Sequence, residues 1–231
     1  MRIQVDISGL QGLGGFIDKQ ARYAAAVALT KTAQEIRSAI PAELDQVFDR
    51  PTTFTKQGTY LKAARRDELV AEVGFRPIQS KYLKLQAEGG IYMPREGGIR
   101  LPGNIQLNAF GNIPRGTIAK LKAAAENGQL SAALAKRLNV QGNRRKGAKP
   151  LQLFFGVPRG DRWQNAPLGI WRRVPGVDGG PGKLIPVILF EDTPAKYSKR
   201  LDLGQMARPI VAQRFQANLD RALADAMRTA R

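Results

Sequence analysis

The C-terminal segment carries the clearest structural signal in this 231-residue chain. Its apolar residues recur every three or four positions, which is the spacing of one face of an α-helix. They are Leu203, Met206, Ile210, Val211, Phe215, Leu219, Leu223 and Met227. A helix with one apolar stripe must bury that stripe against another element. Asp202 and Gln205 form a candidate capping pair at its beginning, and Pro209 either kinks the helix or marks its start.

A second helical pattern runs from Phe16 to Ile40, near the N-terminus. Pro41 cannot keep a backbone hydrogen bond inside a helix, so we expect a break there and a shorter helix after it. Apolar positions of the two terminal helices should together form the core between helices and sheet. The predicted core residues are Phe16, Tyr23, Val27, Ile36, Ile210, Phe215, Leu219 and Leu223.

Short segments of alternating or continuous apolar residues lie between these helices and predict strands. "TYLKAA" and "ELVAEVGF" should pair as a hairpin across "RRDE", and three later apolar segments suit an antiparallel meander. The sequence therefore predicts an α+β fold, in which one antiparallel sheet is covered by long N- and C-terminal helices. Its expected strands are 2–8, 69–75, 151–157, 168–174 and 184–190.

The middle of the chain, residues 86–150, is expected to elaborate this single domain. Residues 1–85 would form its first half, and residues 151–231 would supply the remaining strands and the last helix. Residues 86–118 are rich in Gly, Pro and Asn, which is typical of a functional or flexible segment. We expect this segment to reach a neighbouring subunit as an arm, and a small helical hairpin to follow it. The candidate contact residues of the arm are Tyr92, Arg95, Arg100, Phe110 and Arg115.

The formal net charge of +18 indicates negatively charged partners. Residues 101–200 hold 17 basic and 5 acidic side chains, so they carry most of the excess. Four of these charges form a run without any acid, at Arg144, Arg145, Lys146 and Lys149. The run could contact DNA, dock on an acidic neighbour, or keep a loop solvated before an aggregation-prone strand. The aromatic residues near it are Phe154, Phe155, Trp163 and Trp171, of which at least half should point into a core.

The chain has no Cys and no His. It therefore lacks disulfides, Ser-His-Asp and Cys-His pairs, and zinc or haem sites built on those ligands. Glu191 and Asp192 are adjacent and should face opposite sides of a strand, which disfavours an acid–base or metal pair. "GNIPRG" and "GLGG" lack the phosphate-loop pattern and are better explained as turns. We expect no enzymatic activity, no cofactor, no metal and no membrane segment.

Several longer segments carry a resemblance to a known family. They include "FDRPTTFT", "LQAEGG", "FGNIPRG" and the closing stretch from "PVILFEDTP" to "RALADA". The chain resembles a minor tail or tail-completion protein of tailed bacteriophages, and is similar to the minor tail protein Z group of lambdoid phages. The resemblance covers nearly the whole chain and brings no catalytic residue with it.

The resemblance implies a structural virion protein, assembled in the host cytoplasm. Such a subunit would form a ring, expected to be a hexamer, at the neck or head-proximal tail end. Its partners would be copies of itself, the tail terminator, the tail tube or head-connector proteins, and packaged DNA without sequence preference. We favour protein docking for the basic run, because it precedes a strand that could extend a neighbour's sheet. The alternative, based on charge alone, is a sequence-nonspecific nucleic-acid-binding protein.

Overall fold

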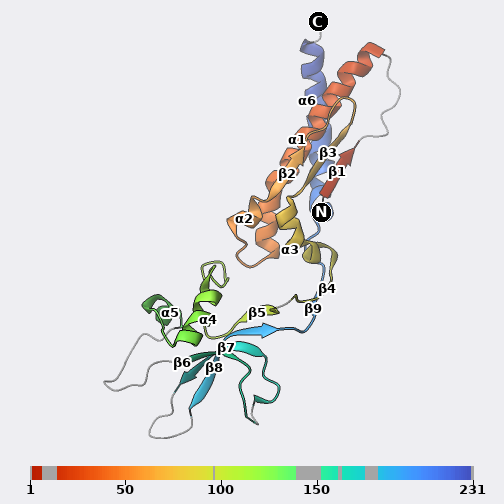
Figure 1. Cartoon of the computed structure of the whole chain (residues 1–231). Coiled ribbons are helices and arrows are strands. Elements are labelled where there is room, and N and C mark those ends of the chain that lie inside the picture. Colours follow the sequence, from red (N-terminus) through yellow and green to blue (C-terminus); the bar gives the residue numbers. More distant parts are fainter. Residues whose placement is uncertain are drawn as a thin grey trace. The chain divides into compact units, whose positions relative to one another are not determined.

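A computed structural model describes residues 2–6, 15–95, 97–138, 152–160, 163–174 and 182–229. Helices and antiparallel sheets are both present, which confirms the α+β class (Figure 1). The chain divides into two compact units. The first unit is residues 1–90 together with 196–231, and the second is residues 91–195. A two-stranded sheet, formed by β4 (Gly90–Tyr92) and β9 (Ala195–Tyr197), lies where the chain passes between the units.

The first unit combines two long helices with a three-stranded antiparallel sheet in the order β1-β3-β2. Helices α1 and α6 come from opposite ends of the chain and run side by side (Figure 1). The elements of this unit are β1 (Arg2–Asp6), α1 (Gly15–Val47), α2 (Thr53–Lys56), β2 (Thr59–Lys62), β3 (Val70–Phe75), α3 (Pro77–Glu88) and α6 (Leu203–Thr229). The predicted hairpin is confirmed, because β2 pairs with β3.

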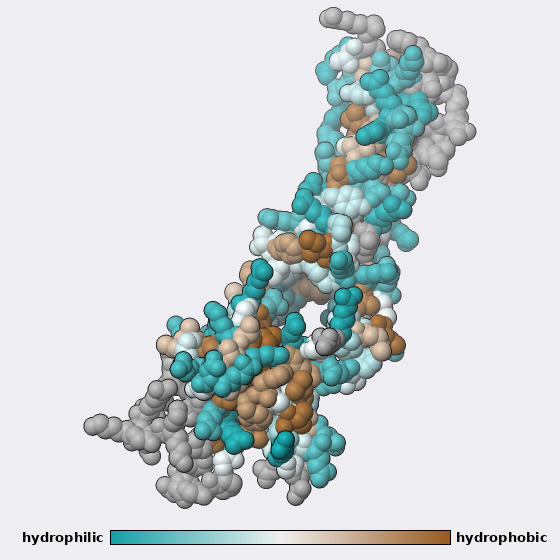
Figure 2. All heavy atoms as spheres, in the orientation of Figure 1, coloured by the Kyte–Doolittle hydropathy of each residue, from teal (hydrophilic) through white to brown (hydrophobic). Residues whose placement is uncertain are grey.

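The core of the first unit only partly matches the predicted stripe. Ile36 is fully buried, and Ile210, Phe215, Leu219 and Leu223 pack half-buried against core clusters. Tyr23 and Val27 were expected in the core but are 41% and 38% exposed, so that part of the prediction is wrong. The side chain of Phe16 lies outside the described residues. Hydrophilic atoms cover most of the face of this unit seen in Figure 2.

Alanines explain why Tyr23 and Val27 face outward. Ala24 and Ala28 of α1 cluster with Ala222 and Ala226 of α6, and all four are buried. Side chains this small let two helix backbones approach closely, so the buried face of α1 is centred on the alanines. The neighbouring larger residues are thereby turned to the surface. The hydrophobicity of the residues alone does not reveal which face of α1 is buried.

A polar contact lies within the apolar interface of α1 and α6. The Asn218 amide, 5% exposed, donates hydrogen bonds to Thr32 Oγ1 at 3.1 Å and to Glu35 Oε1 at 3.3 Å. Buried amide bonds have strict geometry, so this one fixes how the two helices align.

Asn218→Ala should lower the free energy of unfolding of the first unit by about 1–3 kcal/mol, because Thr32 loses a buried partner. Urea titration followed by circular dichroism measures this loss. Gln213→Ala, which changes an exposed side chain of the same helix, is the matched control and should change stability little. Equal stability of the two variants would contradict a structural role for the amide.

Both helix prolines lie inside their helices, which contradicts the expected break at Pro41 and excludes Pro209 as the start of the last helix. Pro41 lies inside α1, which continues to Val47, so the predicted break is wrong. Ile40 and Leu44 are fully buried on either side of it, and their packing offsets the lost backbone hydrogen bond. Pro209 also lies inside its helix, α6.

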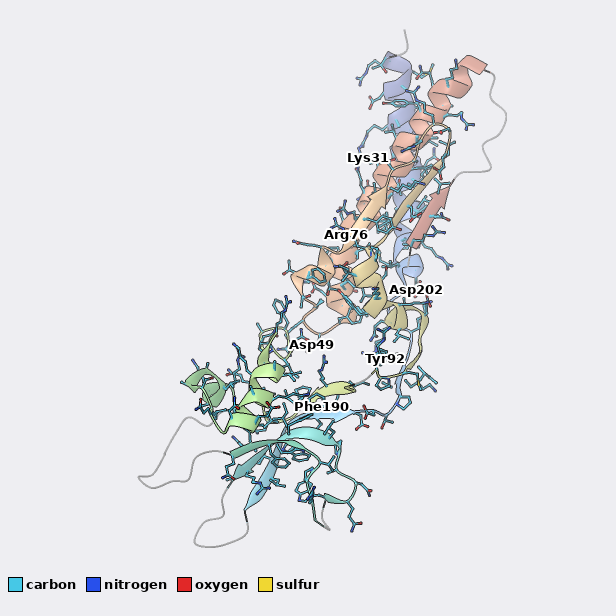
Figure 3. The ribbon with its side chains drawn as sticks, in the orientation of Figure 1. Lys31, Asp49, Arg76, Tyr92, Phe190 and Asp202 are labelled. Carbon is cyan, nitrogen blue, oxygen red and sulfur yellow. The ribbon has the colours of Figure 1, made fainter. Side chains whose placement is uncertain are left out.

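The beginning of α6 has the predicted capping contact. The Gln205 N–H donates to Asp202 Oδ1 at 3.0 Å. Figure 3 labels Asp202 at this helix end. A hydrogen bond from the Lys199 ammonium is the main cause of the lowered pKa of Asp202, and the backbone N–H of Gln205 adds to it. The sequence spacing therefore located both the helix end and its cap.

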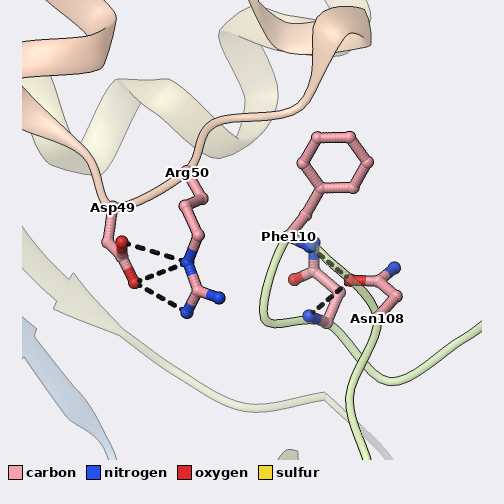
Figure 4. A network of polar contacts seen from close by, with 5 residues as sticks. Asp49, Arg50, Asn108 and Phe110 are labelled. Atoms are coloured by element: carbon pink, nitrogen blue, oxygen red, sulfur yellow. Dashed lines mark hydrogen bonds and ion pairs between the residues drawn. The ribbon is translucent and has the colours of Figure 1, made fainter.

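The chain leaves α1 through an ion pair between adjacent residues. Arg50 Nη2 lies 3.0 Å from Asp49 Oδ2 (Figure 4). This hydrogen bond, and then the positive charge itself, lower the pKa of Asp49. Arg50 has a φ of 48°, which is uncommon for a residue other than glycine. Both side chains are exposed, so the pair shapes the turn and adds little to stability.

The second unit contains a four-stranded antiparallel sheet in the order β5-β8-β7-β6, with two short helices. Its elements are β5 (Ile99–Pro102), α4 (Thr117–Asn127), α5 (Ala132–Arg137), β6 (Gln152–Gly156), β7 (Leu168–Val174) and β8 (Lys183–Glu191). The predicted meander and the two helices of the hairpin are confirmed. The single sheet is not, because the described parts of β6, β7 and β8 belong to a different sheet from β1 and β3.

The predicted division of the chain changes accordingly. Strands β6, β7 and β8 were assigned to the same domain as the terminal helices, but they fold with the middle segment. Leu121 of α4 and Leu138 pack against Ile170 and Ile188 of the sheet, and all four are buried. Residues 91–195 therefore build a hydrophobic core of their own, as a separate unit inserted in the sequence of the first.

The expected arm is also partly folded. Strand β5 pairs with β8, and the Gly103 N–H then donates to the Val187 carbonyl at 3.0 Å. Three residues later, the Gln106 N–H donates to the Arg137 carbonyl at 2.8 Å. Residues 99–106 are thus bound to the second unit and are not a free arm.

Candidate functional site

The structure brings two of the predicted contact residues together. Arg100 and Arg115 line one groove of the second unit, with a volume of about 720 Å³. Phe110 stands on the same loop as Arg115, whereas Tyr92 and Arg95 are exposed but do not line the groove. Arg144, Arg145, Lys146 and Lys149 lie outside the described residues.

The groove is formed by β5, the loop 111–116 and the first turns of α4. Arg100 is directly opposite Phe190 of β8, so both side chains project from the sheet face on which α4 packs. Figure 3 labels Phe190 on this sheet. Three cationic side chains, those of Arg100, Arg115 and Lys122, converge on the groove from a strand, a loop and a helix. We call this site the basic groove.

Lys122 is held in place by two aromatic rings. Its Nζ lies 4.0 Å from the ring centroid of Phe155 and 5.2 Å from that of Phe190. The two rings contact each other edge to face, with centroids 5.6 Å apart. The negative faces of the rings attract the ammonium group and orient it. Sequence reasoning missed Lys122, since nothing in its neighbourhood distinguishes it from Lys120.

The loop before α4 is a rigid turn. Asn108 Oδ1 accepts the N–H of Phe110 at 3.0 Å and that of Asn112 at 2.9 Å (Figure 4). Gly111 and Gly116 have φ values of 73° and 77°, where other residues are strained. This confirms that "GNIPRG" serves as a turn. The same turn leaves the Phe110 ring 43% exposed.

Among the described residues, no acidic side chain compensates the charge of the basic groove. No Asp or Glu lines it, and within the described ranges no ion pair involves Arg100, Arg115 or Lys122. Helix α4 begins here without a side-chain cap and without an acidic residue in its first turn. The helix dipole therefore adds positive potential at this end of α4. The groove is therefore electropositive on every wall.

The four aromatic residues singled out from the sequence differ in burial. Trp171 is buried, Phe154 and Trp163 are half-buried, and Phe155 is 38% exposed. Trp171 packs edge to face on Trp163 and donates from Nε1 to the Gly156 carbonyl at 3.1 Å. Arg173 lies over Phe154, with Cζ 5.3 Å from the ring centroid. The four aromatic residues therefore do not form one continuous exposed surface on which bases could stack.

Arg172 is a half-buried cation that sequence reasoning did not single out. It donates from Nη1 to the Leu138 carbonyl at 2.9 Å and from Nη2 to Asn104 Oδ1 at 3.1 Å. Burial lowers its pKa. Its Nε is buried without a partner among the described residues. These bonds tie the end of α5 and the chain after β5 to the sheet, so we assign Arg172 a structural role.

The acidic candidates do not form a site. Glu191 accepts hydrogen bonds from the hydroxyl and the N–H of Thr193, which lower its pKa, and Asp192 is exposed. The described part of the chain holds no group of three His, Cys, Asp or Glu residues that could bind a metal. Over the same residues, no helix has the length and apolarity that a bilayer crossing requires. Comparisons with protein-family models, curated proteins and solved structures find no match to this chain.

Proposed function

We propose that this chain is a structural virion protein of a tailed bacteriophage, without enzymatic activity. It completes the tail and joins it to the head, as a hexameric ring at the neck or head-proximal tail end. Its partners are copies of itself and the tail terminator, tail tube or head-connector proteins. The resemblance in sequence motivates this role, and an open strand at the edge of the second unit supports assembly.

The open strand is β6, the last strand in the order β5-β8-β7-β6. Within the described residues no strand pairs with its outer edge, and Phe155 on it is 38% exposed. Val157, directly after the strand, is 50% exposed. The opposite edge strand, β5, instead carries Arg100 and Pro102, which discourage pairing with another chain. Strand β5 also exposes one apolar side chain, Leu101, but only next to these two residues. The free edge of β6, with Phe155 and Val157 exposed along it, is therefore the better surface for pairing among the described residues, and this observation carries the proposal.

A free edge suits assembly through strand addition. A strand from a neighbour would satisfy the unpaired N–H and C=O groups of β6 and cover Phe155. Such a contact joins two different surfaces, and repeating it gives a closed ring when its rotation divides a full turn evenly. The basic run lies just before β6 in the sequence, where it would add charge attraction to an acidic neighbour.

Gln152→Lys/Val157→Lys should prevent ring formation while leaving the fold intact. Both positions are exposed, and lysines at an edge oppose strand pairing by charge and solvation. Sedimentation velocity and native mass spectrometry measure the oligomeric state of the purified chain. Gln213→Lys/Ala217→Lys adds the same charge at exposed positions of α6 and is the matched control. Rings formed equally well by both double variants would rule out β6 as the contact.

The virion role has its own test. Purified particles of the phage that encodes the chain should contain it in a small, fixed copy number. Quantitative mass spectrometry of particles measures that number. Absence of the chain from complete particles would remove the virion role, whatever the oligomeric state of the isolated protein.

A sequence-nonspecific nucleic-acid-binding protein is the second candidate. The observation that favours it is the net charge of +18, together with the basic groove, which is lined by no acid among the described residues. This function requires tight binding of arbitrary duplex DNA by the isolated chain, with steep salt dependence. Charge reversal of Arg144, Arg145, Lys146 and Lys149 should then weaken that binding. Feeble binding at physiological salt would exclude this function as the main one.

A further inference from the structure

We propose that the basic groove binds a segment of single-stranded nucleic acid. Arg100, Arg115 and Lys122 would contact its phosphates, and Phe110 would stack on one of its bases. The site would recognise the strand without reading its sequence. This inference goes beyond the structural role, because it assigns a ligand to three cations that do not lie on β6.

The charges of the groove suit phosphates. Its three cations are not neutralised by any acid within the described residues, so they remain available for a polyanion. An arginine can bind two phosphate oxygens at once, and a lysine supplies a point charge. Each phosphate neutralised releases condensed counterions, which makes binding favourable and dependent on salt.

The backbone positions of the three cations are fixed before any ligand arrives, and the side chain of Lys122 is oriented as well. Arg100 belongs to a paired strand, and Lys122 is oriented by Phe155 and Phe190. Arg115 lies inside the turn closed by the hydrogen bond from the Thr117 N–H to the Pro114 carbonyl, at 3.1 Å. A fixed backbone and an oriented lysine reduce the ordering cost of binding, so more of the attraction appears as affinity.

Phe110 favours a nucleic acid over an acidic peptide. An acidic peptide would use the three charges, but it has no need of the exposed ring of Phe110, the residue directly before Gly111 in the wall of the groove. Successive bases of a single strand stack on such rings, whatever their identity. In a duplex the bases are paired and stacked on one another, so they cannot reach Phe110. Among these ligands, only a single strand uses both the cations and the ring.

Fluorescence anisotropy with a labelled oligothymidylate of about a dozen nucleotides tests the site on the full chain. Arg100→Glu/Arg115→Glu should weaken binding at least tenfold and make its salt dependence shallower by about two charges. Phe110→Ala should weaken binding about 5- to 150-fold and leave the salt dependence unchanged. Lys120→Glu/Lys183→Glu is the matched control, since it reverses two exposed charges of the same unit outside the groove.

The same measurements are repeated with Arg144, Arg145, Lys146 and Lys149 replaced by glutamine, so that the basic run cannot mask the groove. Equal weakening by the groove variant and its control would overturn the proposal. So would a polyglutamate peptide that competes with the oligonucleotide and binds Phe110→Ala normally, or a duplex that binds more tightly than the single strand. Ring formation by Arg100→Glu/Arg115→Glu, measured separately, distinguishes failure of this site from failure of the structural role.

Discussion

Replacing Trp171 with alanine is expected to lower the free energy of unfolding of the second unit by about 3–5 kcal/mol. The side chain is buried, packs on Trp163 and donates a hydrogen bond to the Gly156 carbonyl. Its removal leaves a cavity and takes a hydrogen bond from the carbonyl of Gly156, the last residue of β6. The loss should appear as a shift of the urea midpoint of tryptophan fluorescence. Both tryptophans of the chain lie in the second unit, so Trp163 still reports on it.

The first unit should be unaffected by this change. Far-UV circular dichroism, dominated by α1 and α6, should give the wild-type midpoint for Trp171→Ala. Gln152→Ala, an exposed substitution on β6, is the control for the second unit and should shift neither signal by more than about 0.5 kcal/mol. If Trp171→Ala shifted both signals equally, the two units would unfold as one cooperative body.

Ile36→Ala is the converse experiment on the first unit, with an expected loss of about 2–5 kcal/mol. Ile36 is fully buried in a core that also contains Leu29, Leu44, Val73 and Phe75, so its truncation leaves a cavity among them. The circular dichroism midpoint should fall to lower urea concentration. Gln34→Ala, on the exposed side of the same helix, should leave it nearly unchanged.

Tryptophan fluorescence distinguishes the possible outcomes for Ile36→Ala. A wild-type fluorescence midpoint together with a lowered circular dichroism midpoint is the expected result, because each unit has its own hydrophobic core. Coincident shifts of both signals would contradict independent units. The pair of variants matters for function as well, since Trp171→Ala should impair β6 and the basic groove together, whereas Ile36→Ala should impair neither.

The candidate site could be predicted only in part. Arg100, Phe110 and Arg115 were identified from the sequence because they lie in a stretch rich in Gly, Pro and Asn, where exposed functional residues are common. Their grouping with Lys122 could not be predicted. It depends on the pairing of β5 with β8 and on the face of the sheet that α4 covers.

The sequence by itself determined the local structure of this protein. The spacing of apolar residues located both terminal helices, the hairpin of β2 and β3 and the later meander. The distance from Asp202 to Gln205 located the cap of α6. These features depend on residues close together in the chain, whose backbone geometry and side-chain direction follow from short-range rules.

Only the tertiary structure decided which strands share a sheet and which helix face is buried. Strand β5 pairs with β8, which lies far from it in the sequence, Pro41 remains inside α1, and Tyr23 faces solvent while Ala24 is buried. Each outcome is set by the packing of distant segments: alanines that let α1 and α6 approach, and a core that keeps a helix continuous through a proline. Local pattern cannot encode these choices, because the free energy that decides them arises from contacts formed only in the folded chain.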